Sequence, residues 1–157
     1  MFRALRRKKQ ALSQEECEAI LKRGETCVLA LAGDDGYPYA VPVNYCYVEG
    51  KVYIHCAKEG HKIDAVRRDP KASLTIIDCA KVLPEEYSTH YQSVIAFGRM
   101  RILEEEGEMR RAIEAFSLRH SPKVPEDERE RVIARWMPSV AVIEFTPEYV
   151  SGKRSRY

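Results

Sequence analysis

Alternation of apolar and polar positions dominates the chain and predicts a protein rich in β-strands. Six stretches combine this alternation with β-branched or aromatic residues: 26–32, 37–48, 51–57, 72–79, 92–103 and 139–145. Tight turns that contain glycine, at 33–36 and 49–50, separate the first three of them. The sequence therefore predicts six strands, of which the first three form an antiparallel meander.

Apolar residues spaced three or four positions apart predict helices between these strands. The first helix begins at a capping box, in which Ser13 and Glu16 each accept a hydrogen bond from the other's backbone N–H, and Gly24 closes it. Three further helices are expected: 61–68, 104–120 and 127–137. The stretch 81–90 contains Pro84 and is expected to be a loop.

Antiparallel strands with helices gathered outside them are typical of an α+β barrel rather than a doubly wound parallel sheet. No repeat, low-complexity segment or linker interrupts the pattern. We therefore expect one domain over residues 1–157, with a basic arm at 1–12 and a polar tail at 149–157.

Two of the predicted strands, 37–48 and 92–103, contain residues that are unusual inside a regular strand. Pro38 and Pro42 cannot donate to a neighbouring strand, so their strand is expected to be an edge, to be bulged or to face a ligand. Asn44 needs hydrogen-bond partners if it is buried. Gly98 indicates a bend or a close approach of another backbone.

Charge and composition narrow the function classes. The 157 residues carry 26 Lys and Arg against 24 Asp and Glu, too even a balance for a nucleic-acid-binding surface over the whole protein. The basic run 3–9 is interpreted as an arm on the surface, with contact to RNA or lipid as the alternative. No apolar run is long enough to span a bilayer, and no apolar segment of a secretory signal follows the basic residues, so a cytoplasmic protein is expected.

Several kinds of chemistry lack their motifs. Five cysteines, an odd number without a C-x-x-C pair, predict neither a disulfide framework nor a zinc ribbon. The four histidines lack metal-ligand spacing, so no metal site is expected. Neither a dinucleotide fingerprint, nor a phosphate loop, nor a serine nucleophile motif is present.

The stretch 52–67 remains as the best candidate site. A strand ends at His55, Cys56 and Ala57, a glycine turn follows, and a helix opens with His61 and Lys62. A helix N-terminus presents free N–H groups and partial positive charge, so this corner is a plausible anion seat. We interpret it as the phosphate end of a cofactor site.

Five short motifs in this order resemble the pyridoxamine 5′-phosphate oxidase-like flavin proteins, specifically the branch of nitroimidazole-resistance (Nim-type) reductases. They are Pro42-Val43-Asn44-Tyr45, Tyr53-Ile54-His55-Cys56-Ala57, Glu59-Gly60-His61-Lys62, Asp69-Pro70 and Ser93-Val94-Ile95-Ala96-Phe97-Gly98-Arg99. The resemblance implies a six-stranded antiparallel split β-barrel with flanking helices. It also implies a homodimer that binds FMN at the subunit interface.

Carried over to this chain, the resemblance assigns a role to each of eight residues. Val43 and Asn44 would lie beside the flavin ring, and His55, Cys56 and Ala57 along the ring and ribityl chain. Lys62 would meet the phosphate. Ser93 would be another flavin contact, and Trp136 would close the pocket.

The chain departs from the family in two ways. The resistance branch commonly has glycine after the strand histidine, where this chain has Cys56, which leaves less room near the cofactor. The arginine-rich substrate residues of true pyridoxamine phosphate oxidases are not recognisable, so oxidation of vitamin B6 is not expected.

The resulting hypothesis is an FMN-dependent oxidoreductase that takes electrons from NAD(P)H or another donor and reduces small nitroaromatic-type acceptors. His55 would be the catalytic residue, as proton donor or substrate anchor near the reacting edge of the flavin. FAD and haem are alternative cofactors. The alternative functions are a non-catalytic flavin- or haem-binding protein for sensing or storage, and a structural dimer with a vestigial pocket.

Overall fold

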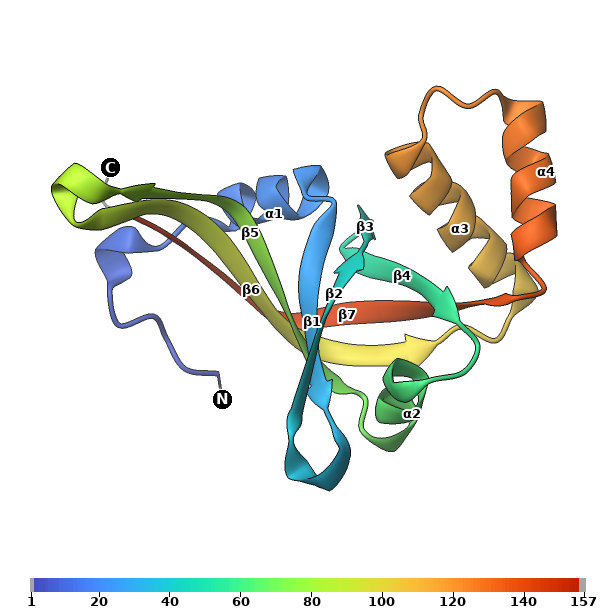
Figure 1. The fold of residues 1–157 in the computed structure, drawn as a ribbon, viewed down its shortest axis with the longest axis horizontal. Helices are drawn as coiled ribbons and strands as arrows, with labels where there is room; N and C mark the ends of the chain where they lie inside the picture. Colours follow the sequence, from blue (N-terminus) through green and yellow to red (C-terminus); the bar gives the residue numbers. More distant parts are fainter. Residues whose placement is uncertain (1, 156–157) are drawn as a thin grey trace.

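Seven antiparallel strands form one sheet in the order β2-β1-β5-β6-β7-β4-β3 (Figure 1). The coordinates are a computed structural model that describes residues 2–155. The strands are β1 Thr26–Ala32, β2 Pro38–Asn44, β3 Cys46–Val48, β4 Lys51–Ala57, β5 Lys71–Leu83, β6 Ser88–Ile102 and β7 Val140–Arg154. The α-helices are α1 Gln14–Arg23, α2 His61–Arg68, α3 Glu106–His120 and α4 Glu126–Trp136, with 3-10 turns at Lys8–Gln10, Asp34–Gly36 and Pro84–Glu86. The α+β split-barrel prediction is confirmed.

The sheet has seven strands rather than six because the predicted strand 37–48 breaks at Tyr45. The Tyr45 side chain is fully buried, and its hydroxyl donates to the carbonyl of Leu21 at 2.9 Å. The part before the break, β2, pairs with β1, and the part after it, β3, pairs with β4. These two parts are the opposite edges of the sheet, so hydrogen bonds do not close the barrel. The edge position predicted for the proline-containing strand is confirmed.

The core lies inside the curved sheet. Side chains from five strands that are completely or almost completely buried meet there: Leu29, Ile54, Leu74, Val94 and Phe145. Burying a side chain of this size stabilises the fold by roughly 1.5–3 kcal/mol. The same alternation that buries these residues turns their neighbours outward, toward the helices or solvent.

Two local predictions are confirmed in detail. The Ser13 hydroxyl accepts from the Glu16 N–H at 3.1 Å, while the Glu16 carboxylate accepts from the Ser13 N–H at 2.7 Å. Gly98 sits at a close approach of β7 to β6, because a Cβ there would be 2.1 Å from the Thr146 carbonyl oxygen. The β6–β7 register shifts between Phe97 and Gly98.

Two regions differ from the predictions. The stretch 81–90 is the end of a long β5–β6 hairpin rather than a loop, because Pro84 occupies the first position of its 3-10 turn and does not interrupt either strand. The last strand continues from the predicted end at 145 to Arg154, since β6 offers pairing partners along this whole length. Most of the predicted polar tail is therefore strand. Residues 156–157 and Met1 lie outside the described residues.

The molecule has two distinct ends. The β5–β6 hairpin and the 3-10 turn Lys8–Gln10 lie at one end, and α3 and α4 lie at the other (Figure 1). In the predicted basic arm, Ala11 forms a β-bridge with Lys153. Within residues 2–155, no helix is long and apolar enough to cross a membrane.

Candidate functional site

A cavity of about 740 Å³ lies between the end of β4, the start of α2, the helices α3 and α4, and the start of β7. Its walls are largely apolar and come from segments far apart in the sequence. The lining residues are His55, Cys56, Ala57, Lys62, Ile113, Phe116, Ser117, Val132, Ile133, Trp136, Ser139 and Val140. We call this cavity the apolar pocket.

The strand β4 presents His55 to this pocket. Val52 and Ile54 are completely buried in the core, so the alternation of the strand turns His55 to the opposite side, where it is exposed beside α3. The His55 ring meets the Phe116 ring edge to face, with centroids 4.4 Å apart and planes at 83°. Phe116 also packs on His120, whose Nε2 donates to the Tyr45 carbonyl at 2.9 Å. An aromatic stack therefore holds His55 and α3 together.

Burial sets the charge state of both polar side chains at this end of β4. Partial burial, and then the positive charges of His120 and Lys62, lower the pKa of His55 below its ordinary value. Burial raises the pKa of the Cys56 thiol, although Lys62 opposes this effect. At neutral pH the site therefore presents a neutral imidazole and a protonated thiol.

Lys62 provides the positive charge of the pocket. It lies in the first turn of α2, after Gly60, whose φ of 123° is accessible mainly to glycine. No side-chain hydrogen bond caps the start of this helix, so its first N–H groups are available to a ligand. Neither Arg67 nor Arg68, at the end of α2, lines the pocket, and Arg68 pairs with Asp34 at 2.8 Å.

Five of the eight predicted site residues line the apolar pocket: His55, Cys56, Ala57, Lys62 and Trp136. The other three, Val43, Asn44 and Ser93, do not. Val43 packs against the hydrophobic core.

Asn44 and Ser93 share the outer face of the sheet, away from the core. Asn44 is opposite Thr26 on β1, and Ser93 is opposite Ile77 on β5. Because Val28 faces Thr75 across β1 and β5, the alternation of both strands puts the two pairs on one face.

This outer face, centred on β5 and β6, is exposed and rich in apolar side chains. Ile77, Ile95 and Phe97 are 62%, 38% and 39% exposed. At its edge, Phe2 stacks on Phe97 and Tyr149, with centroid distances of 5.5 and 5.1 Å. We call it the outer apolar face.

Sequence reasoning missed the roof of the pocket. Ile113 and Phe116 on α3, and Val132 and Ile133 on α4, form this roof, and the sequence pattern alone gives them no role in a site. A stripe that packs on a core and one that lines a cavity have the same spacing. The two cases differ in the exposure of the side chains: Val132 is 45% exposed and Trp136 is 55% exposed. Such exposed fractions are known only from a structure.

No metal centre competes with this cavity in the part of the chain from residue 2 to 155. There, no group of three or more His, Cys, Asp and Glu side chains could hold a metal ion. All five cysteines are free.

Comparison with known families and proteins gives a consistent picture. The family described as pyridoxamine 5′-phosphate oxidase matches residues 13–154. An uncharacterized protein from Rhizobium meliloti (strain 1021) is 33% identical over 94 residues, which are 60% of this chain. The match spans 57% of the length of that curated relative.

Three solved structures show the same fold at low sequence identity. A conserved hypothetical protein from Mycobacterium tuberculosis has a TM-score of 0.84 and 19% identity, covering 98% of this chain and 91% of its own. A candidate 5-nitroimidazole antibiotic resistance protein from Bacteroides thetaiotaomicron has a TM-score of 0.75 and 21% identity, and the match covers 92% of this chain and 86% of its own. An FAD- and haem-binding protein from Mycobacterium smegmatis has a TM-score of 0.76 and 20% identity, and the match covers 95% of this chain and 74% of its own.

Proposed function

The chain belongs to the pyridoxamine 5′-phosphate oxidase family, and from this membership we propose that it is a flavin-dependent oxidoreductase. The apolar pocket is the proposed flavin site, and FMN is the proposed flavin. The observation that carries the proposal is the position of Lys62 and His55 at one end of a cavity that is otherwise apolar and aromatic.

The lining residues fit such a group. A volume of about 740 Å³ is within the usual range of small-molecule sites. Phe116 and Trp136 offer ring surfaces for a planar heterocycle. Lys62 and the uncapped start of α2 offer a positive charge and N–H donors for one phosphate. A single cation suits a ligand that is anionic at one end only.

When bound, the flavin would supply the redox chemistry, and the protein supplies binding, orientation and control of protons. Phe116 holds the His55 ring edge-on, so the imidazole has one preferred direction. Because its pKa is lowered, His55 is neutral at pH 7, so one ring nitrogen can accept a proton while the other donates a hydrogen bond.

The proposed assembly is a homodimer with the flavin at the interface. It is supported by the position of the predicted flavin contacts, since Asn44 and Ser93 lie on the outer apolar face rather than in the pocket. A second subunit that brings this face against the apolar pocket would unite the two groups of residues. Exposed patches of this kind are typical of protein interfaces.

The proposed reaction passes electrons from NAD(P)H or another donor to a small nitroaromatic-type acceptor. Support comes from the fold shared with the candidate 5-nitroimidazole resistance protein and from the aromatic walls, which suit stacking of a flat acceptor. The absence of recognisable arginine-rich substrate residues argues against oxidation of vitamin B6.

The test is a visible spectrum of the freshly purified protein, identification of the released cofactor by mass, and steady-state turnover. The proposal predicts a bound flavin, and oxidation of NAD(P)H that depends on a nitroaromatic acceptor. The matched variant His55→Gln should bind flavin but turn over more slowly. A protein that takes up no flavin on reconstitution would refute the proposal.

A haem- or flavin-binding protein without turnover is the second candidate, and the neutral His55 favours it. An imidazole with a lowered pKa keeps its lone pair available for iron, and the fold is shared with an FAD- and haem-binding protein. A Soret band that disappears in His55→Ala would establish haem. A flavin-loaded protein that oxidises no donor with any acceptor would establish storage or sensing.

A further inference from the structure

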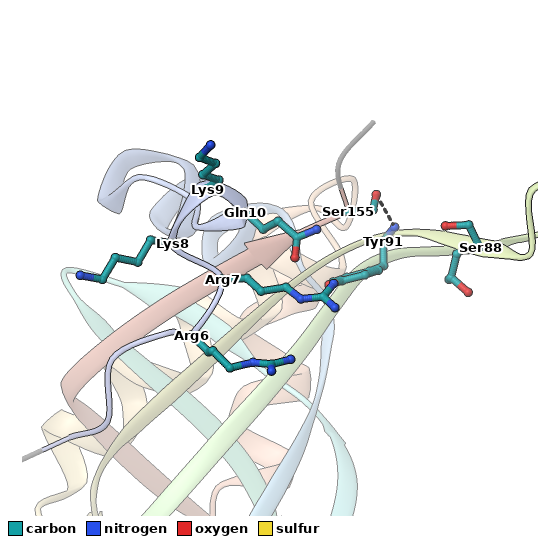
Figure 2. Close-up of a pocket in the computed structure, with 9 residues that line it drawn as sticks. Arg6, Arg7, Lys8, Lys9, Gln10, Ser88, Tyr91 and Ser155 are labelled. Atoms are coloured by element: carbon teal, nitrogen blue, oxygen red, sulfur yellow. Dashed lines mark hydrogen bonds between the residues drawn. The ribbon is translucent and has the colours of Figure 1, made fainter.

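A second hollow, of about 700 Å³, lies where the N-terminal arm crosses the β5–β6 hairpin (Figure 2). We call it the basic pocket. Arg6, Arg7, Lys8 and Lys9 line one side, and the hairpin with its neighbour Ser155 lines the other. It shares no lining residue with the apolar pocket and lies at the opposite end of the molecule (Figure 1).

The charge of the basic pocket is uncompensated among residues 2–155. None of its four cations has a carboxylate within 4.0 Å there, and no acidic residue lines the hollow. Arginines elsewhere, such as Arg23 and Arg101, are paired with carboxylates. Figure 2 shows the Arg6 and Arg7 side chains extending toward the hairpin, whereas the Lys8 and Lys9 side chains extend away from it, so an anion in the hollow would meet the two guanidinium groups.

Gln10 provides a second, independent indication of a ligand. Its side chain is only 6% exposed, it lines the pocket, and its Oε1 has no hydrogen-bond partner. Figure 2 shows the amide directed toward Tyr91, across the hollow from the arm. A buried carbonyl oxygen without a partner is uncommon, and a hydroxyl or amino group of a ligand would satisfy it.

The wall that carries these groups is held in place by hydrogen bonds. The Leu12 N–H donates to the Gly152 carbonyl at 3.0 Å, beside the bridge of Ala11 with Lys153. Tyr91 and Ser155 exchange two bonds: the Ser155 N–H donates to the Tyr91 carbonyl at 2.9 Å, and the Tyr91 N–H to the Ser155 hydroxyl at 3.2 Å. The arm is therefore fixed to β7, and the hairpin strand β6 is fixed to the residue that follows β7.

We propose that the basic pocket binds a nucleotide, meaning a ligand with at least two phosphate charges and a ribose or base that carries donors. Arginine forks and lysine charges suit phosphate oxygens. A lone phosphate would leave most of a 700 Å³ hollow empty and could not donate to Gln10 at the same time.

Isothermal titration calorimetry with ADP tests the proposal, with adenosine and inorganic pyrophosphate as the incomplete ligands. We expect saturable binding of one ADP per chain and binding at least about tenfold weaker for each incomplete ligand. Binding of ADP should weaken as salt is raised. Adenosine that binds as well as ADP would overturn the role of the cations, and equal binding of pyrophosphate would overturn the role of Gln10.

Matched variants locate the site. The double variant Arg6→Gln/Arg7→Gln should bind ADP at least about tenfold more weakly, whereas Arg3→Gln, on the same arm but outside the pocket, should bind it normally. Gln10→Leu should weaken ADP but leave pyrophosphate unchanged, and thermal melts verify that each variant is folded.

Three outcomes would refute the proposal. They are no saturable binding of ADP, equal losses in Arg3→Gln and the double variant, and a loss in Lys62→Gln, which would place ADP in the apolar pocket. A mixed-sequence oligonucleotide that binds far more tightly than ADP, and more so with length, would identify a nucleic-acid surface instead.

Discussion

The two ends of this protein carry cavities of similar size and opposite character. The apolar pocket has aromatic and aliphatic walls and one lysine, while the basic pocket has four cations and hydroxyl groups. The apolar pocket gains its walls from helices that pack against the barrel, and the basic pocket from an arm and a hairpin that are each paired with β7. Size alone therefore does not select the ligand of a cavity. The apolar pocket suits a flat ring with a single anionic end, and the basic pocket suits a ligand with several charges.

The largest effect is expected from a change that removes both pockets together. Gly98→Ala would bring a Cβ to within 2.1 Å of the Thr146 carbonyl, at the seam of β6 and β7 that both ends share. We expect a loss of about 3 kcal/mol or more in the free energy of unfolding, measured by urea titration. Gly107→Ala is the control: its new Cβ would meet the flexible Glu105 carboxylate, so the change should stay within about 1 kcal/mol. Equal stability of the two variants would contradict the packing described for Gly98.

A charge on the outer apolar face should weaken ligand binding in the apolar pocket and leave ligand binding in the basic pocket unchanged. Ile95→Glu would bury a carboxylate in the proposed dimer interface, so the protein should become monomeric in light scattering. Flavin affinity should fall by roughly 30- to 100-fold, because the partner's contacts are lost, while binding of ADP is unchanged. The matched control is Lys81→Glu, an exposed change on the hairpin. A dimeric, flavin-competent Ile95→Glu would exclude this face as the interface.

The roof of the apolar pocket can be tested through its exposed tryptophan. Trp136→Ala removes a ring surface that is 55% exposed, so stability should change by less than about 1 kcal/mol. Flavin affinity should fall by roughly five- to tenfold, as expected for the loss of one aromatic stacking partner. Arg135→Ala, the exposed neighbour on α4, should leave both quantities unchanged. Flavin fluorescence titration and thermal melts measure the two effects, and unaltered flavin binding in Trp136→Ala would exclude the ring contact.

The smallest effect concerns pH and the neutral His55. Its pKa is lower in the folded than in the unfolded protein, so protons bind the unfolded chain preferentially. Stability is therefore full above about pH 6.5 and falls as the pH drops through the folded pKa. His55→Gln should flatten part of this fall in a series of thermal melts. A variant with the same pH dependence as the parent protein would show that burial does not act on His55.

The sequence predicted the local structure better than the site. The capping box at Ser13, the close approach at Gly98 and the edge position of β2 follow from backbone chemistry that acts within a few residues or through one missing donor. The hairpin at 81–90 was missed because Pro84 weakens a strand pattern, although it occupies the turn.

The site depends on long-range geometry that periodicity does not encode. The corner from His55 to Lys62 could be predicted because a strand, a turn and a helix start are adjacent in sequence. Phe116 and Ile133 could not be assigned to it, since an apolar stripe looks the same against a core or a cavity. Asn44 and Ser93 were placed beside the same ligand, but in one chain they lie on another face of the sheet.

The most direct test of the proposed site is the dissociation constant of FMN for three proteins: the parent chain, Lys62→Gln and Arg6→Gln/Arg7→Gln. If the apolar pocket holds the flavin with its phosphate at Lys62, Lys62→Gln should bind FMN roughly 10- to 100-fold more weakly, and the double variant should bind it as the parent chain does. If instead the double variant loses FMN and Lys62→Gln retains it, the flavin belongs to the basic pocket and the assignment of the apolar pocket is wrong.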